Sequence, residues 1–181
     1  MKKKIAFVVA VPGTARSFLK DHMTQLVQHY DVHLLANFQN DKEKDEFIQV
    51  GVKCLCIPIR RKISLWNDLK ALLAIYEIFK RERFDCVHSV TPKAALLNAM
   101  AGWLAKIPHR IHIYTGQVWA TREGIMRTLL KGMDKIPAWL NTDLLVDGVS
   151  QRRFLIKEGV LKESNSKVLA NGSIAGVRLE R

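Results

Sequence analysis

Cysteine is scarce in this sequence: the 181 residues include only Cys54, Cys56 and Cys86. So small and odd a number argues against a disulfide framework, and we expect three reduced core cysteines in a protein of a reducing compartment. Glycine and proline are also few, at 10 and 5 residues, which excludes a collagenous or low-complexity chain. No apolar run reaches the ~20 residues of a membrane-spanning helix. What remains is a mixed composition in a length that fits one domain, since domains usually have roughly 100–200 residues.

Several motifs of common enzymes are absent as well. The dinucleotide fingerprint G-x-G-x-x-G and the P-loop G-x-x-x-x-G-K-[ST] do not occur, and the first loop contains only Gly13. Cys54 and Cys56 lack the second pair or nearby histidine cluster of a zinc site. The nucleophile motif G-x-S-x-G is missing too. These absences argue against a dehydrogenase, a P-loop NTPase, a zinc enzyme and an α/β-hydrolase.

Positive charge, in contrast, is in excess. The 29 Lys and Arg residues oppose 17 Asp and Glu, which gives a formal net charge of +12. Such a surface attracts anions, whether nucleic acids, acidic lipid headgroups or phosphorylated substrates. The basic residues are spread over all three thirds of the sequence and no nucleic-acid-binding motif is recognisable, so nucleic acid is the weaker hypothesis for a partner.

Short apolar segments alternate with segments of helical periodicity from one end of the sequence to the other. The apolar segments predict strands at Ile5–Val11, Val32–Leu35, Val52–Ile57, Cys86–His88, Arg110–Tyr114, Leu144–Val146 and Val168–Leu169. Most are nearly continuous, as in parallel strands buried on both faces. We therefore predict an α/β fold, a Rossmann-like three-layer sandwich with a mainly parallel sheet of about seven strands, in one domain over residues 1–181. The basic start, Met1–Lys4, leads into the first strand rather than forming a secretory signal, because no clear cleavage site follows.

Local signals mark the ends of the predicted helices. Apolar residues within Phe18–Tyr30 share one helical face. Ser64 and Thr91-Pro92 are candidate starts of two later helices, as a capping residue and as a cap followed by proline in the first helical position. Gly159 is typical of the residue that ends a helix.

In an open α/β sheet, ligands bind beyond the carboxyl ends of the strands, near the point where the strand order reverses. Three predicted loops lie there: Pro12–Arg16, Ser89–Lys93 and Thr115–Gly124. The first two each lead into a helix, whose unpaired N–H groups suit a phosphate or carboxylate. Lys93 opposes the dipole of its helix unless an anion is bound, which indicates a binding role. A plain turn with a solvated Arg16, and a core position for His88, remain the alternatives.

The third loop, Thr115–Gly124, is longer than most strand-to-helix connections. It combines two glycines, an amide, hydroxyl groups, Arg122 and Trp119. This mixture favours a polar substrate that bears hydroxyl groups, with Trp119 offering an apolar face to a sugar ring or a lipid tail. The alternative is a compact loop whose tryptophan packs back onto the core.

The segment 60–83 has basic clusters at both ends of an apolar helical stretch. Arg60–Lys62 precedes Leu65 and Trp66, and Lys80–Arg83 follows. Peripheral proteins meet anionic membrane interfaces in this way. An ordinary crossover helix that covers the sheet is the alternative for the helix itself, while its basic ends contact lipid.

Three stretches carry a resemblance to a known family. His88–Ala101 and Ile107–His112 resemble the N-terminal domain of GT-B glycosyltransferases of glycosyltransferase family 4. Thr115–Thr121 is similar to a subgroup associated with bacterial capsule and O-antigen assembly. The closing stretches Asp147–Leu155 and Asn171–Arg181 are similar to the exit from that domain, so that the likeness covers essentially the whole chain.

The resemblance implies transfer of a sugar from a nucleotide-sugar to a lipid-linked or saccharide acceptor, with retention at the anomeric carbon. In this family the N-terminal domain binds the acceptor and the C-terminal domain binds the donor. Such enzymes position the two substrates and stabilise the departing diphosphate as an oxocarbenium-like centre forms. The resemblance implies no metal ion and no cofactor, and a peripheral location at the cytoplasmic face of the cell membrane, where anionic lipid is the further partner.

The sequence departs from the family in three respects. Thr115 and Val90 stand where many members have histidines, and a threonine does not act as a base at neutral pH. The family would continue beyond Arg181 into its donor domain, so we expect this chain alone not to transfer sugar. The resemblance gives binding roles to Gly13, Thr115, Gly116 and Gln117, and no residue receives a catalytic or metal-binding role.

The three loops and the resemblance together define one candidate acceptor-binding set. It comprises Gly13, Thr14, Arg16, His88, Thr91, Lys93, Thr115, Gly116, Gln117, Trp119 and Arg122. The alternative function is a non-catalytic α/β module that binds an anion such as a nucleic acid or a nucleotide.

Overall fold

The computed structural model describes residues 2–60, 64–169 and 172–174. Arg61 and Lys62 of the predicted basic cluster, and residues 171 and 175–181 of the closing stretch Asn171–Arg181, lie outside the described residues. In chain order the elements are β1 (Lys4–Val8), α1 (Pro12–Phe18), α2 (Lys20–Leu26), β2 (Asp31–Ala36), α3 (Lys42–Ile48), β3 (Lys53–Cys56), α4 (Leu65–Glu82), β4 (Cys86–Ser89), α5 (Pro92–Leu104), β5 (His109–Tyr114), α6 (Gly124–Leu140), β6 (Asp143–Val146), α7 (Val149–Lys157), a short 3₁₀ turn (Glu163–Asn165) and β7 (Ser166–Val168).

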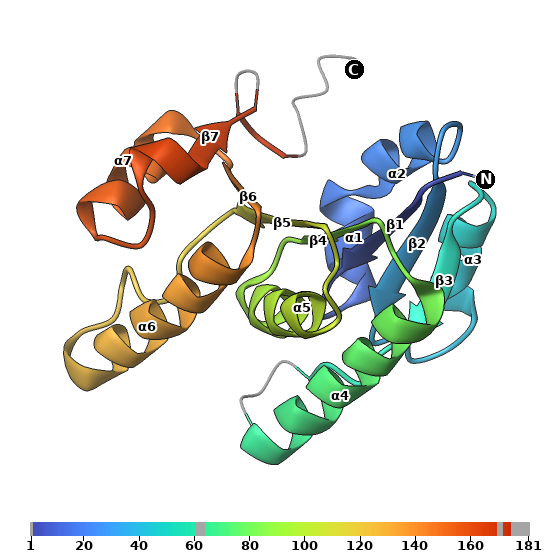
Figure 1. Cartoon of the computed structure of the whole chain (residues 1–181), viewed down its shortest axis with the longest axis horizontal. Coiled ribbons are helices and arrows are strands. Elements are labelled where there is room, and N and C mark those ends of the chain that lie inside the picture. Colours follow the sequence, from blue (N-terminus) through green and yellow to red (C-terminus); the bar gives the residue numbers. More distant parts are fainter. Residues whose placement is uncertain (1, 61–63, 170–171, 175–181) are drawn as a thin grey trace.

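The strands form one sheet in the order β3-β2-β1-β4-β5-β6-β7, and every neighbouring pair is parallel. The chain moves outward from β1 to β3 and then returns to the other side of β1, so the strand order reverses between β1 and β4 (Figure 1). Ile5 in β1 pairs with Val32 on one side and with Cys86 on the other. The Rossmann-like α/β fold with a seven-stranded sheet is thus confirmed.

Alternate side chains of the strands enter separate cores on the two faces of the sheet. Ala6 and Val8 of β1 pack with Ala71 of α4 and Ala94 of α5. Phe7 packs on the opposite face with residues of α1, α2 and α3, among them the fully buried Ala15, Met23 and Phe47. Figure 1 shows α4 and α5 below the sheet and α1 and α2 above it, which gives the predicted three layers.

Most of the local signals mark real helix boundaries. Thr91 is the N-cap of α5, and Pro92 occupies its first turn. Ser64 precedes α4, and its N–H donates to Oδ2 of Asp68 at 3.2 Å. Gly159 follows α7 in the left-handed region with φ of 66°, a conformation that glycine adopts without strain. These ends depend on residues within one turn, which explains why the sequence signals suffice.

Three local expectations were wrong. The helix expected within Phe18–Tyr30 is α2, which spans only Lys20–Leu26; Phe18 instead ends α1, and Leu19 between the two helices has a non-helical backbone. The first strand ends at Val8 rather than Val11. Cys56 is exposed rather than in the core, because β3 is the edge strand of the sheet, while Cys54 and Cys86 are partly buried; all three are free thiols.

Candidate functional site

A cavity of about 480 Å³ opens at the carboxyl edge of the sheet, and we call it the edge cavity. Its walls come from the loop after β1, the N-terminal turns of α4 and α5, the loop after β5, and the middle of α6. The residues that line it are Ala10, Val11, Thr14, Asp68, Thr91, Pro92, Lys93, Leu96, Leu97, Val118, Trp119, Leu130, Met133 and Asp134. An apolar cavity with a few convergent polar groups at a strand-order reversal is the usual form of a ligand site in this architecture.

Two threonines line this cavity from opposite sides of the strand-order reversal. Thr14 belongs to α1 and Thr91 caps α5, with the Thr91 carbonyl accepting from the N–H of Ala95 at 2.7 Å. The Oγ1 atom of Thr91 is buried and has no hydrogen-bond partner among the residues that the structure describes. A buried hydroxyl without a partner is costly, so this atom is a donor and acceptor that a ligand can satisfy.

A buried ion pair forms one wall of the edge cavity. Nζ of Lys93 lies 2.6 Å from Oδ1 of Asp68, and both side chains are mostly buried. We expected the cation in the first turn of α5 to require a bound anion; the carboxylate of Asp68, reaching across from α4, already supplies that negative charge. The pair therefore ties the first turns of α4 and α5 together at the cavity.

The opposite wall holds a buried carboxyl group. Oδ2 of Asp134 accepts from Nε1 of Trp119 at 2.7 Å, and the Asp134 carbonyl accepts from the hydroxyl of Tyr114 at 2.8 Å. Burial raises the pKa of the Asp134 carboxyl, while the Trp119 hydrogen bond lowers it by a smaller amount. The same burial raises the pKa of the Tyr114 hydroxyl. These groups link the loop after β5 to α6.

Trp119 does not present the open face that we expected of it. Its ring is 1% exposed, stacks on Phe154 of α7 at 5.5 Å between ring centres, and is held by Asp134. The cations of Arg127 and Lys131 each lie 5.6 Å from its ring centre. The alternative in which this tryptophan packs back onto the core is the correct one, because the loop buries its largest side chain between α6 and α7.

The structure brings together Thr14, Thr91, Lys93 and Trp119 of the expected set, and leaves the others outside the wall of the edge cavity. Arg16 pairs with Glu46 of α3, with its Nε 2.6 Å from Oε1. The side-chain amides of Gln117 and Gln151 are 3.3 Å apart, which joins the third loop to α7. Thr115 and Gly116 precede Gln117 in the same loop, and Arg122 is exposed. A Cβ added at Gly13 or Gly116 would meet no atom within 4 Å, so both glycines leave open space.

His88 lies on the other face of the sheet, in a second cavity. This sheet-face cavity, of about 360 Å³, is lined by residues of β1, β4, β5, β6 and α2, by Leu19 before α2, and by the segment 172–174. The His88 ring lies 5.3 Å from that of Phe7, and desolvation lowers its pKa to about 3. The neighbouring His112, on the opposite face of the sheet, has its pKa lowered by burial to about 4. Both imidazoles are neutral at pH 7, as in core histidines.

Sequence reasoning missed Asp68 and Asp134, although one of them left a signal. Asp134 is the only acidic residue in the helix Gly124–Leu140, which otherwise contains apolar, basic and small residues. A lone carboxylate in such a segment indicates a buried or paired position. Asp68 carries no comparable signal, because acidic residues are common in the first turn of a helix. Within the described ranges, no group of three or more His, Cys, Asp and Glu side chains is placed to hold a metal ion.

The model of one protein family, described as a glycosyl transferase 4-like domain, matches residues 13–148 of this chain. The capsular polysaccharide biosynthesis glycosyltransferase CapM of Staphylococcus aureus is 31% identical over 155 residues, which are 85% of this chain and 40% of that protein. The UDP-Gal:alpha-D-GlcNAc-diphosphoundecaprenol alpha-1,3-galactosyltransferase of Escherichia coli is 26% identical over 94% of this chain and 45% of that protein. The chain thus spans less than half the length of these relatives.

Two solved structures share the fold. Anabaena HepE in complex with UDP and glucose superposes with a TM-score of 0.68 at 16% identity, over 95% of this chain and 45% of that one. The UDP-N-acetylglucosamine 2-epimerase of Rickettsia bellii gives 0.70 at 18% identity, over 96% of this chain and 46% of that one. Because an epimerase superposes as well as HepE does, the likeness concerns the fold alone.

Proposed function

The chain belongs to the glycosyl transferase 4-like family, as the N-terminal half of a GT-B enzyme related to those of capsular and surface polysaccharides, and from this premise we propose that it binds the acceptor. The complete reaction moves a sugar from a nucleotide-sugar to a lipid-linked or saccharide acceptor, with retention at the anomeric carbon. The observation that carries the acceptor role is the edge cavity, which lies at the strand-order reversal, is mostly apolar, and has in its wall Thr91, whose buried Oγ1 has no partner among the described residues.

The chemistry of this cavity suits an amphiphilic acceptor. Leu96, Leu97 and Met133 offer apolar surface, and the hydroxyls of Thr14 and Thr91 offer hydrogen bonds to a sugar or a phosphate. Arg122 and the net charge of +12 favour an anionic group such as a diphosphate, and an anionic membrane surface beside it. The diphosphoundecaprenol in the name of the Escherichia coli relative is an acceptor of this class.

The donor nucleotide-sugar is bound outside these 181 residues, in a second domain facing the carboxyl edge. The chain by itself therefore binds acceptor without turning over nucleotide-sugar. In this arrangement the residues of the edge cavity orient the acceptor hydroxyl, and catalysis depends on bringing the two substrates together and on stabilising the departing diphosphate.

A binding experiment tests the acceptor role. The probe is a water-soluble, short-chain prenyl diphosphate that carries one N-acetylhexosamine, and its affinity is measured by titration calorimetry. Thr91→Val keeps the shape of the side chain and removes its hydroxyl, so we expect binding to weaken by about threefold to tenfold, the value of one hydrogen bond. Thr24→Val on α2 is the matched control, since its hydroxyl donates to Lys20 O far from the edge cavity.

Two outcomes would contradict the proposal. Equal affinity of Thr91→Val and the native chain for the probe would show that the edge cavity is not the acceptor site. Salt-dependent binding of oligonucleotides with no binding of the prenyl probe would favour the anion-binding module instead. Release of nucleoside diphosphate from a nucleotide-sugar by the purified chain would overturn the assignment of the donor to a second domain.

A further inference from the structure

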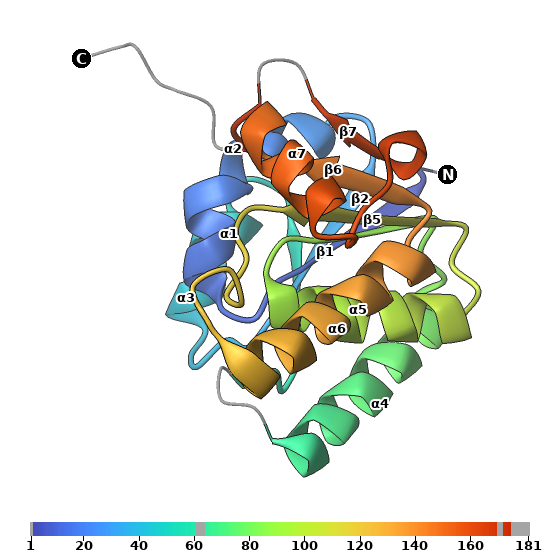
Figure 2. The same cartoon turned by 90° about the vertical axis from the view of Figure 1, so that its left-hand side faces the viewer.

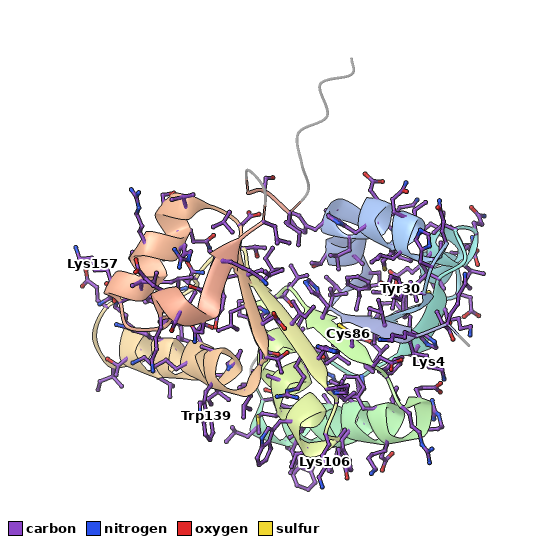
Figure 3. All side chains as sticks on the ribbon, turned by 45° about the horizontal axis from the view of Figure 1, so that its top comes forward. Lys4, Tyr30, Cys86, Lys106, Trp139 and Lys157 are labelled. Atoms are coloured by element: carbon purple, nitrogen blue, oxygen red, sulfur yellow. The ribbon has the colours of Figure 1, made fainter. Side chains whose placement is uncertain are left out.

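The wall of the edge cavity lacks the positive charge that predominates in the chain as a whole. Among the described residues that line it, the charged ones are Asp68, Lys93 and Asp134, two acidic and one basic. The whole chain, in contrast, has 29 Lys and Arg against 17 Asp and Glu. Figure 3 shows two exposed lysines, Lys106 and Lys157, at the outer edge of the molecule, and neither lines the cavity. The net charge of +12 therefore does not make this cavity a site for an anion.

The one cation of this wall is already neutralised within the protein. Nζ of Lys93 lies 2.6 Å from Oδ1 of Asp68, and the other oxygen of Asp68 accepts from the N–H of Ser64 at 3.2 Å. Figures 1 and 2 show α4, α5 and α6 side by side in one helical layer, and α5 packs against both of the others. The pair thus joins α4 to α5, while Asp134 reaches the cavity from α6. A phosphate would have to compete with the Asp68 carboxylate for the lysine.

Asp134, in contrast, has no cation among the described residues. It is 8% exposed, and its Oδ2 accepts from Nε1 of Trp119 at 2.7 Å. The preceding cations of α6, Arg127 and Lys131, both pair with Glu158 instead. No described residue donates to Oδ1 of Asp134, so this oxygen has its lone pairs available to a ligand. A phosphate beside this carboxyl would add repulsion between like charges, whereas a hydroxyl group would donate to it.

A second polar atom without a partner among the described residues is Oγ1 of Thr91, which can both donate and accept. Leu96, Leu97 and Met133 add apolar surface to the same cavity. An uncharged sugar ring matches all of these groups, because its hydroxyls donate and accept and its C–H faces are apolar. A prenyl chain has no donor for Asp134, and a diphosphate at neutral pH brings negative charge toward it.

We propose that the edge cavity receives an uncharged sugar ring, one hydroxyl of which donates to Asp134, and that the phosphates of the acceptor stay outside it. The inference rests on the proposed function and deepens it, because it names the part of the acceptor that this cavity binds. Asp134 is then a specificity-determining residue. A sugar without the matching hydroxyl leaves a buried carboxyl oxygen unpaired, which disfavours binding far more than the loss of an apolar contact does.

The test changes the protein and the ligand together. The prenyl probe, and analogues that each lack one hydroxyl of its N-acetylhexosamine, are titrated by calorimetry into the native chain and Asp134→Asn. Asparagine keeps the shape and can still accept from Trp119, but its NH₂ group does not accept a hydrogen bond. We expect Asp134→Asn to bind the complete probe at least about tenfold more weakly. One deoxy analogue should bind equally to both chains, since it lacks the hydroxyl that Asp134 recognises.

The matched control is Asp143→Asn, which removes a carboxylate at the start of β6, 3.7 Å from Nζ of Lys167 and outside the edge cavity. It should bind every probe as the native chain does. Equal affinity of Asp134→Asn and the native chain for the complete probe, or equal losses in the two variants, would overturn the proposal. So would an equally large loss with a prenyl diphosphate that carries no sugar, because Asp134 would then act on the lipid or its phosphates.

A competition experiment tests the charge argument on the native chain, without any substitution. The probe is the methyl glycoside of the same N-acetylhexosamine, which has no phosphate, and its binding is followed by NMR titration. We expect inorganic pyrophosphate not to displace the glycoside, and the affinity to change little with salt. Displacement of the glycoside by pyrophosphate would place an anion in the cavity and would overturn the proposal, even if Asp134→Asn does not fold.

The two proposals fail separately. Binding of the prenyl probe that weakens in Thr91→Val but not in Asp134→Asn leaves the acceptor role and contradicts the sugar contact. Binding of the glycoside that weakens in Asp134→Asn, with no binding of any prenyl probe, supports the sugar contact and contradicts a lipid-linked acceptor.

Discussion

The edge cavity and the sheet-face cavity are both mostly apolar and of similar size, at about 480 and 360 Å³. Each contains a buried polar atom without a partner among the described residues, Oγ1 of Thr91 in the edge cavity and Nδ1 of His88 in the sheet-face cavity. They differ in what their paired polar groups hold. In the edge cavity Lys93 pairs with Asp68 and Trp119 with Asp134, which ties helices and a loop together. In the sheet-face cavity, Nε2 of His22 contacts the carbonyl of Ile174 at 2.7 Å, and the carboxylate of Asp147 accepts from the N–H of Ile174.

This difference has a topological origin. The helices α1, α2 and α3 cover one face of β1, β2 and β3, and within the described residues none of them extends over the same face of β5 and β6. The sheet-face cavity is the resulting apolar hollow, and its polar groups hold the segment 172–174 across it. The edge cavity forms where loops and helix starts meet, and its paired polar groups tie those segments together. Two cavities of similar volume and apolarity thus hold different parts of the fold: the segment 172–174 against the sheet in one, and the starts of α4 and α5 and the loop after β5 in the other.

The largest expected effect concerns the wall of the edge cavity. Trp119→Ala removes a fully buried ring and leaves the Asp134 carboxyl without its donor, so we expect the free energy of unfolding to fall by about 3–5 kcal/mol. Urea denaturation of the native chain and the variant measures this difference. Trp139→Ala, at a residue that is 82% exposed, is the control and should change the value by less than ~0.5 kcal/mol. Similar losses in both variants would refute the packing role of Trp119.

The sheet-face cavity predicts a dependence of stability on pH. The pKa of His88, near 3, is depressed below the ordinary 6.5, so the unfolded chain binds a proton more readily at mildly acidic pH. The stability contributed by neutral His88 is therefore complete above pH 6.5 and is lost as the pH falls from 6.5 toward 3. His88→Leu should remove about 1.4 kcal/mol per pH unit from the slope of the free energy of unfolding between pH 6 and 4.5.

Denaturation at several pH values measures that slope. Because His112 contributes in the same direction, with a pKa of about 4, the variant should keep part of the native dependence. An unchanged slope in His88→Leu would show that this imidazole is solvated rather than buried. Affinity for the prenyl probe should be the same in the variant, which separates the sheet-face cavity from the acceptor site.

The smallest expected effect on stability is at Gly13. An added Cβ meets no atom within 4 Å, and the residue lies in α1 without a positive φ, so Gly13→Ala should leave stability unchanged or raise it by about 0.4–1 kcal/mol. Binding of the prenyl probe should weaken, since the methyl group occupies space beside Thr14. The contrasting control is Gly102→Ala, whose Cβ would lie 3.0 Å from Cδ of Arg110 and should destabilise the domain. Tighter probe binding by Gly13→Ala would contradict a role for this loop.

The sequence predicted what depends on neighbours along the chain. The start of α5 at Thr91-Pro92 and the end of α7 at Gly159 follow from the conformations of those residues. The alternation of apolar strands and helical segments was sufficient for the parallel sheet, because burial on both faces leaves a continuous apolar pattern.

The details of the site depend on contacts between distant residues. Lys93 is paired by Asp68 and Trp119 is held by Asp134, and both partners come from other helices. The sequence places Trp119 in the loop after β5, but it does not show whether the ring faces solvent or lies between α6 and α7. Which side of a strand His88 occupies also depends on the register of β4 against β1.

The strand-order reversal has a consequence for how the chain folds. The pairing of β1 with β4 joins the most distant segments of any neighbouring strands, and the N–H of Lys4 donates to Oδ2 of Asp85, 81 positions further on. Closing that long loop costs more chain entropy than any other pairing in the sheet. During synthesis β1, β2 and β3 can pair before β4 leaves the ribosome. The edge cavity is complete only after α5 and its N-cap Thr91 have docked opposite Thr14 of α1. The edge cavity is therefore a late product of folding, assembled at the seam between two halves of the sheet.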